Sequence, residues 1–173
     1  MSLTSKTFRV TMLAMLCIGI ALSAAEAAAK AKVIKAKLIG SWTLVSITNT
    51  SADGKTVQTY GPGDGVLIIE ANGEFVQVLA RPDLPKFASN NRNTGSPDEN
   101  KAVVQGALAL FGKYTVDTKE GSLTLRTERG TFPNWNGTDQ KRIVDTLTAS
   151  ELKWEVPAPS IGGSSVATWK RNK

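Results

Sequence analysis

The chain has 173 residues, with 21 Lys and Arg against 15 Asp and Glu, no His and one Cys, and its formal charge is +6. This length predicts one domain. Because the chain has no His, it cannot hold a Ser/His/Asp or Cys/His nucleophilic site, a His-bearing zinc site or a His general base.

The first 27 residues have the pattern of an export signal. Lys6 and Arg9 precede an apolar run over residues 10–22, and small residues ending at Ala27 offer cleavage sites. The run is shorter than the ~20 residues that a membrane-spanning helix needs. We therefore predict a signal peptide over residues 1–27, with an uncleaved amphiphilic anchor as the alternative. The mature protein is then periplasmic or secreted, with no integral membrane segment.

Cleavage after Ala27 also removes Cys17, the only thiol. A disulfide framework, a catalytic Cys and a Cys-ligated metal are then excluded, and we expect no metal and no cofactor. Losing Lys6, Arg9 and Glu26 lowers the formal charge from +6 to +5.

Residues 28–39 form a basic N-terminal arm that holds four of these positive charges, on Lys30, Lys32, Lys35 and Lys37. The rest of the domain is close to neutral, which argues against a nucleic-acid partner. Two interpretations stay open for the arm: a solvated, mobile segment, or a contact with an anionic membrane surface.

From Gly40 onward, short runs rich in Val, Ile, Leu, Thr and Trp alternate with turn residues, which is typical of an antiparallel barrel or sandwich. We predict eight or nine strands within one domain over residues 40–173. The candidate strands are Gly40–Asn49, Thr56–Tyr60, Gly65–Glu70, Glu74–Arg81, Gly112–Asp117, Ser122–Arg129, Lys141–Leu147, Glu151–Val156 and Ser165–Arg171. Hairpin turns are predicted at Ala52–Gly54, Ala71–Gly73 and Lys119–Gly121.

One helix is predicted to interrupt the strands after Ser96. Ser96 is suited to cap the free amides, Pro97 fits the first turn, and Glu99 completes a capping box. Apolar residues recur at helical spacing from Val103 to Gly112. We expect this apolar stripe to lie on the sheet, as a plug that buries barrel residues or as a lid that governs access of a ligand.

Two stretches, Pro82–Gly95 and Thr131–Gln140, have no assigned regular structure. Each mixes aromatic residues with Asn, Gly, Pro and charge. Loops at the ends of a barrel are where binding groups concentrate, so both stretches are candidate contributors to a site.

The two ends of the domain resemble the barrel pattern of lipocalins. Gly40-Ser41-Trp42 lies at the start of the first strand, and Trp169-Lys170-Arg171 ends the last strand. In lipocalins a Trp near the start of the first strand closes one barrel end, and a basic residue from the last strand lies over it. This resemblance assigns the closure to Gly40, Trp42 and Arg171, with Lys170 as the less favoured alternative to Arg171.

Four ordered motifs and the capped helix resemble the bacterial and fungal lipocalin-like domain family. The motifs are Arg81–Ser89, Phe111–Asp117, Phe132–Trp135 and Gly137–Gln140. The resemblance covers residues 38–171 and implies an all-β, lipocalin-like, up-and-down antiparallel barrel with one inserted helix. The chain departs from the family in one strand, where Leu125-Arg126-Thr127-Glu128 replaces a frequent His pair, so family chemistry that needs imidazole cannot be carried over.

Strand alternation supplies the first candidate binding residues. In the strand over residues 74–81, one face carries Phe75, Gln77, Leu79 and Arg81. We expect this face to line the cavity, with Arg81 at the mouth holding a ligand carboxylate or carbonyl. The alternative for Arg81 is a structural ion pair with Asp83, Asp98 or Asp139.

Further candidates lie in the loops and the late strands. The ligand-binding candidates are Phe87, Arg92, Tyr114, Trp135 and Trp154. Trp135 serves either as a plug against the sheet or as a ligand wall, whereas Trp42 and Trp169 are expected in the core.

These observations predict an exported lipocalin-like protein that binds a small, largely hydrophobic ligand in its barrel. A closed sheet of about eight strands has room for side chains and one small ligand. Two alternatives stay open: an isomerase or cyclase acting on a polyketide- or terpenoid-like substrate, and a protein-interaction module of the cell envelope. We expect no catalytic residue and a monomer or weak dimer.

Overall fold

The computed structural model describes residue 26 and residues 29–173. The predicted signal peptide therefore lies outside the described residues apart from Glu26. Among the described residues, we find no helix both long enough and apolar enough to cross a membrane. The elements in chain order are β1 Gly40–Thr50, β2 Thr56–Tyr60, β3 Gly65–Ile69, β4 Glu74–Ala80, α2 Pro97–Gly106, β5 Ala107–Asp117, β6 Ser122–Gly130, the 3-10 helix η1 Pro133–Trp135, β7 Asp139–Leu147, β8 Glu151–Val156 and β9 Ser164–Arg171.

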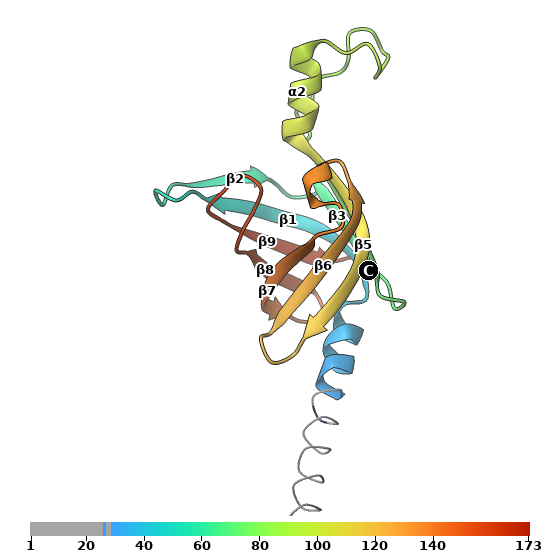
Figure 1. Cartoon of the computed structure of the whole chain (residues 1–173), viewed down its shortest axis with the longest axis vertical. Coiled ribbons are helices and arrows are strands. Elements are labelled where there is room, and N and C mark those ends of the chain that lie inside the picture. The colour runs from blue at the N-terminus through green and yellow to red at the C-terminus, as the bar shows by residue number, and fades with distance from the viewer. Residues whose placement is uncertain (1–25, 27–28) are drawn as a thin grey trace, which may run out of the picture.

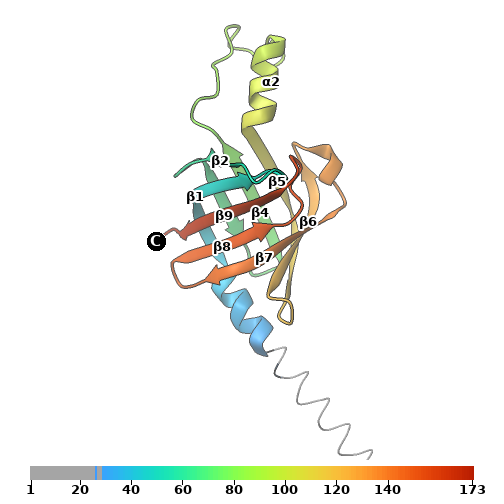
Figure 2. The same cartoon turned by 90° about the vertical axis from the view of Figure 1, so that its left-hand side faces the viewer.

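The strands form one antiparallel sheet that closes on itself. From β3 to β9 each strand pairs with the next along the chain, and β1 pairs with both β3 and β9. Eight strands therefore make a closed ring, while β2 pairs only with β1 and flanks it (Figures 1 and 2). The predicted all-β antiparallel barrel with one inserted helix is confirmed.

The hairpin turn between β3 and β4 shows why the chain reverses where the sequence predicts. Gly73 has a φ of 95°, which a residue with a side chain rarely adopts. The Asn72 side chain accepts a hydrogen bond from the Glu74 amide at 3.0 Å. A local side chain and one glycine therefore set the register that pairs Ile69 with Phe75.

The inserted helix is shorter than predicted, because residues 107–112 belong to β5. The predicted cap is present: Ser96 accepts from the Glu99 amide, and the Glu99 carboxylate accepts from the Ser96 amide. The run Ala107–Phe111 suits a helix by propensity, but it pairs with β4 from Ala80 back to Val76. Tertiary pairing overrides helix propensity here.

The expectation that α2 lies on the sheet is wrong. Figure 1 shows α2 projecting away from one end of the barrel. Gly106 is its only buried residue, and Val104 is 78% exposed. The physical reason is that most of the apolar residues of the expected stripe are in β5, so α2 keeps too few to pack on the barrel.

The part of the basic arm that the structure describes is helical over residues 29–38. We call this segment the N-terminal helix; it lies at the end of the barrel opposite α2 (Figure 1). Leu38 is fully buried, and Ile34 packs against the core. The expectation of a solvated arm is therefore wrong for this apolar side, because the open end of a barrel needs an apolar cover.

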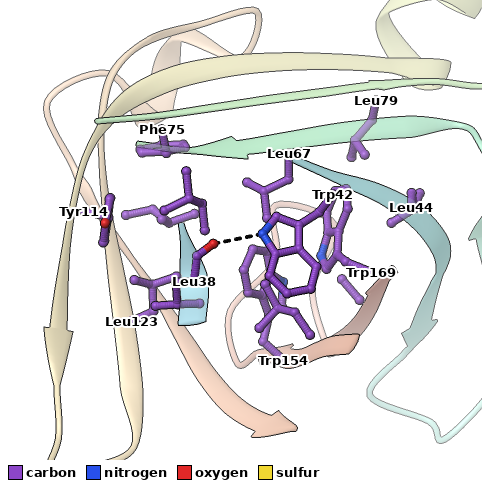
Figure 3. Packing of buried hydrophobic residues seen from close by; sticks show 14 of the residues in the cluster. Leu38, Trp42, Leu44, Leu67, Phe75, Leu79, Tyr114, Leu123, Trp154 and Trp169 are labelled. Atoms are coloured by element: carbon purple, nitrogen blue, oxygen red, sulfur yellow. Dashed lines mark hydrogen bonds between the residues drawn. The ribbon is translucent and has the colours of Figure 1, made fainter. Parts of the chain in front are cut away.

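The core fills the inside of the ring. On β4 the side chains of Phe75, Gln77 and Leu79 are buried, whereas Val76 and Val78 are 42% and 44% exposed. The same alternation on the other strands directs large side chains inward, as Figure 3 shows for Trp42, Trp154, Trp169 and their neighbours.

Candidate functional site

The closed end is built around Trp42, at the start of β1. Its indole Nε1 donates to the Leu38 carbonyl at 2.9 Å, which ties the first strand to the N-terminal helix (Figure 3). The Arg171 guanidinium lies over the indole ring, 4.0 Å from its centroid. We call Leu38, Trp42 and Arg171 the closing cluster.

The Arg171 guanidinium donates hydrogen bonds to three backbone carbonyls. Its Nε donates to Ala149 at 2.7 Å, its Nη1 donates to Ile39 at 2.6 Å, and its Nη2 donates to Lys37. A Cβ at Gly40 would lie 2.5 Å from Arg171 Nη1, and Gly40 has a φ of 133°. The Gly, Trp and Arg that the sequence assigns to the closure therefore lie together at this end.

A second group of inward residues is polar. Gln77, Thr127 and Arg142 are 6%, 0% and 3% exposed. We call these three residues the polar interior set. Each lies opposite an inward position on a neighbouring strand: Gln77 faces Leu110, Thr127 faces Gly112, and Arg142 faces Leu123. Residues opposite each other in an antiparallel pair share one face, so the set points into the barrel.

Two polar atoms of this set have no hydrogen-bond partner in the part of the chain that the structure describes. They are Gln77 Oε1 and Thr127 Oγ1, and the indole Nε1 of Trp169 is a further unpaired interior atom. Leaving a buried polar group unpaired costs about 1–3 kcal/mol. Such groups are few in native proteins, and each calls for an explanation, of which a bound molecule is one.

Arg142 is the most unusual member of the set. Its Nη1 donates to the Lys141 carbonyl at 2.9 Å, and the four ion pairs among the described residues do not include it. Burial lowers the pKa of Arg142 from 12.5 to about 10, so the guanidinium stays charged at neutral pH. The barrel therefore encloses a positive charge with no protein counter-charge beside it.

Arg81 has a different environment. Its Nε lies 3.1 Å from Asp83 Oδ1, and its side chain is 37% exposed. Arg81 also packs against Gly106, where a Cβ would lie 3.0 Å from its Nε. Of the two roles that the sequence left open, the structure shows the Asp83 ion pair, and ligand contact stays a prediction.

The other predicted residues of the strands point into the core. Phe75, Leu79 and Trp154 are 1%, 3% and 1% exposed. Tyr114 is also buried, but its hydroxyl donates to the Glu70 carbonyl at 3.0 Å, and Lys35 of the N-terminal helix lies over its ring. Burial raises the pKa of the Tyr114 hydroxyl. Tyr114 therefore faces the closed end, apart from the polar interior set.

The predicted loop residues do not gather at one place. Phe87 packs against Gly95 within the loop before α2, and Arg92 is exposed in the same loop. Trp135, in η1, is partly buried against the core and meets Phe132 edge to face at 5.5 Å. Trp135 therefore packs as a plug would, and its contact with a ligand stays a prediction.

Two clefts lie where the N-terminal helix meets the strands. The more enclosed cleft, of about 260 Å³, is bordered by Val33 and Leu38 of the helix and by Val116, Leu123 and Leu147. The other, of about 350 Å³, lies between Lys35 and Tyr114. We call the first the basal cleft and use it below as the competing location for a ligand.

Sequence reasoning missed Arg142 and gave Thr127 no role. On β7 the residues alternate between Gln140, Arg142 and Val144 on one side and Lys141, Ile143 and Asp145 on the other. Both sides mix charge with apolar groups, so the pattern does not say which is inside. The pairing of Val144 with the buried Trp154 fixes the answer, and that pairing is a tertiary fact.

Comparison with known proteins gives one family match. The model of the lipocalin-like domain family matches residues 39–172. No curated protein matches the chain. Among solved structures, the chain is similar to a lipocalin-like protein from Bacteroides uniformis, with 14% identity, a TM-score of 0.45 and coverage of 79% of this chain and 99% of that one.

Two engineered barrels are also similar. A redesigned β-barrel has 16% identity and a TM-score of 0.44, with coverage of 80% of this chain and 95% of that one. A de novo designed fluorescence-activating β-barrel has 11% identity and a TM-score of 0.42, with coverage of 80% and 96%.

Proposed function

The chain belongs to the lipocalin-like domain family, and on that premise we propose that it is an exported protein that binds one small, largely hydrophobic ligand inside its barrel. The observation that carries this proposal is the polar interior set. Unpaired Gln77 and Thr127 and the uncompensated Arg142 lie among mostly apolar inward side chains. A bound molecule would meet these groups and offset their cost.

Affinity and orientation come from different parts of this interior. Apolar surface contributes about 25 cal/mol per Å² buried, so side chains such as Leu79 and Leu110 supply affinity. A few polar groups then fix how the ligand lies. Gln77 is the orienting residue that both the sequence and its burial support, and Arg81 is a candidate at the mouth.

The ligand is expected beside β9, where the inward side chains are small. Ala167 is 3% exposed and lies opposite Ile47 of β1 and Trp154 of β8. Ser165, two residues earlier on the same face, is 5% exposed. These side chains are smaller than the tryptophans and leucines at other inward positions, so we place the ligand beside them.

Probe binding to matched variants tests this proposal. The neutral fluorophore N-phenyl-1-naphthylamine should bind the purified protein saturably, with a rise in emission. Ala167→Leu adds bulk inside the ring and should weaken binding at least about tenfold, since an overpacked interior excludes the probe. Thr168→Leu places the same new side chain on the outer face of β9 and should leave binding unchanged.

Binding at the basal cleft is the result that would contradict this proposal. Val33→Trp adds bulk on the side of that cleft that the N-terminal helix forms, away from Ala167. Binding that survives Ala167→Leu and is lost in Val33→Trp would contradict a site inside the ring. If Ala167→Leu does not fold, Ser165→Leu is the second interior variant.

Export is tested separately by the mass of the protein recovered from the periplasm or medium of cells that express the full-length chain. The expected mass is that of a chain beginning at residue 28. A cell-associated protein that retains residues 1–27 would contradict export with cleavage.

A further inference from the structure

A buried cation in the barrel has no protein partner that balances its charge. Arg142 is 3% exposed, and no carboxylate pairs with it among the described residues. Its one hydrogen bond runs to the carbonyl of the preceding residue, Lys141. The guanidinium has five N–H donors, so one backbone bond uses a small part of its capacity.

Very little of the Arg142 side chain reaches solvent, since the residue is 3% exposed. Long basic side chains usually keep the charged head in water while the stem covers apolar surface. Lys141 behaves in this way on the outer face of β7, where it is 48% exposed and pairs with Glu120. Arg142 is opposite the fully buried Leu123, so its head stays inside the ring.

Burying such a charge is expensive unless an opposite charge meets it. A water molecule would satisfy some of the donors but would leave the charge uncompensated. An apolar residue of similar size would fill the same space at a lower cost. The arginine is therefore better explained by an anion that enters the ring than by packing.

We infer that Arg142 binds the carboxylate of a monoanionic, otherwise apolar ligand inside the barrel. This inference rests on the proposed function and names the class of its ligand. The planar guanidinium offers two parallel N–H donors that match the two oxygens of a carboxylate. One guanidinium balances one negative charge. A dianionic phosphate would leave excess negative charge among Leu123, Leu125 and Val144, in an apolar surrounding.

Titration calorimetry with three matched probes tests this inference at neutral pH. The probes are decanoate, decanol and decyl phosphate, which share a chain and differ in their head group. The purified protein should bind decanoate at least about tenfold more tightly than decanol, because the charge pair forms out of water. It should bind decyl phosphate more weakly than decanoate.

Two variants of neighbouring residues provide the decisive contrast. Arg142→Met should weaken decanoate binding at least about 30-fold and leave decanol binding within about threefold of wild type. Lys141→Met removes the same charge one residue away, on the outer face, and should keep the preference for decanoate. Arg142→Gln serves if the Met variant does not fold, as judged by circular dichroism.

The outcomes separate this inference from the proposed function. If decanol and decanoate bind equally, or if the preference for decanoate survives Arg142→Met, the carboxylate site is overturned and ligand binding stands. An Arg142-dependent preference for decyl phosphate would overturn the carboxylate as the ligand class. If none of the three probes binds, the proposed function itself is contradicted.

Discussion

The closed end and the interior of this barrel each hold an arginine on an inward-facing strand position, and only one of the two is fully used. Arg171 donates to three backbone carbonyls and covers the ring of Trp42. Arg142 donates to one carbonyl and has no counter-charge. The polar groups of the closing cluster therefore find their partners within the protein. Those of the polar interior set need a bound molecule as their partner.

Trp42 and Trp169 differ in the same way, in whether the indole N–H has a hydrogen-bond partner. The indole N–H of Trp42 has a partner in Leu38, but that of Trp169 has none in the described chain. Paired groups stabilise a fold, and unpaired buried groups cost stability unless a ligand meets them. We therefore expect substitutions in the closing cluster to lower stability and substitutions in the polar interior set to raise it.

The largest expected effect is at Trp42. Trp42→Ala should lower the free energy of unfolding by roughly 3–5 kcal/mol, because it leaves a large cavity under Arg171. Urea denaturation followed by circular dichroism measures the loss. Trp42→Phe keeps most of the ring and should cost clearly less. Equal losses in the two variants would show that the buried ring does not support the closed end.

Arg142→Met should act in the opposite direction. The fall in the pKa of Arg142 from 12.5 to about 10 corresponds to a stability gain on the order of 3 kcal/mol when the charge is removed. Urea denaturation of the ligand-free protein measures this gain. Lys141→Met is the control and should change stability little, because its ion pair with Glu120 is exposed. If Arg142→Met instead lowers the free energy of unfolding, Arg142 stabilises the fold by packing and the prediction is wrong.

Thr127→Val should give a smaller gain, of about 1 kcal/mol, because the new methyl group replaces a buried hydroxyl that has no partner. Thr138→Val is the matched control, since that hydroxyl donates to the Trp135 carbonyl at 2.8 Å. The control should lose stability in the same denaturation assay. A loss at Thr127 as well would mean that its hydroxyl has a partner in solution.

The smallest expected effect is at the exposed pair of Asp145 and Lys153, on the border of the basal cleft. Lys153 Nζ lies 2.8 Å from Asp145 Oδ2, and this hydrogen bond lowers the pKa of Asp145 below its usual 3.8. A carboxylate with a lowered pKa in the folded state contributes stability above pH 3.8 and loses it as the pH falls further. The fall in stability from pH 7 to pH 3 should therefore be smaller in Asp145→Asn than in wild type. An unchanged fall would show that the pair contributes nothing in solution.

The fold was largely predictable because its signals are local. The alternation of apolar residues predicts the strands, and glycines such as Gly73, which the structure shows with a positive φ, predict the turns. Most predicted bounds agree with the structure within a few residues. The helix boundary was not predictable, since the run Ala107–Phe111 suits either a helix or a strand and its pairing with β4 decides. Arg142 was missed for a related reason, because only the neighbouring strands show which side of β7 faces inward.

The most direct test of a ligand site in the polar interior is an NMR titration of the isotope-labelled protein with decanoate. The largest backbone amide shifts should fall on β6 and β7, around Thr127 and Arg142, and on β9 around Ala167. Amides of the N-terminal helix should shift little. Shifts confined to that helix, or no shifts at saturating decanoate, would contradict the account.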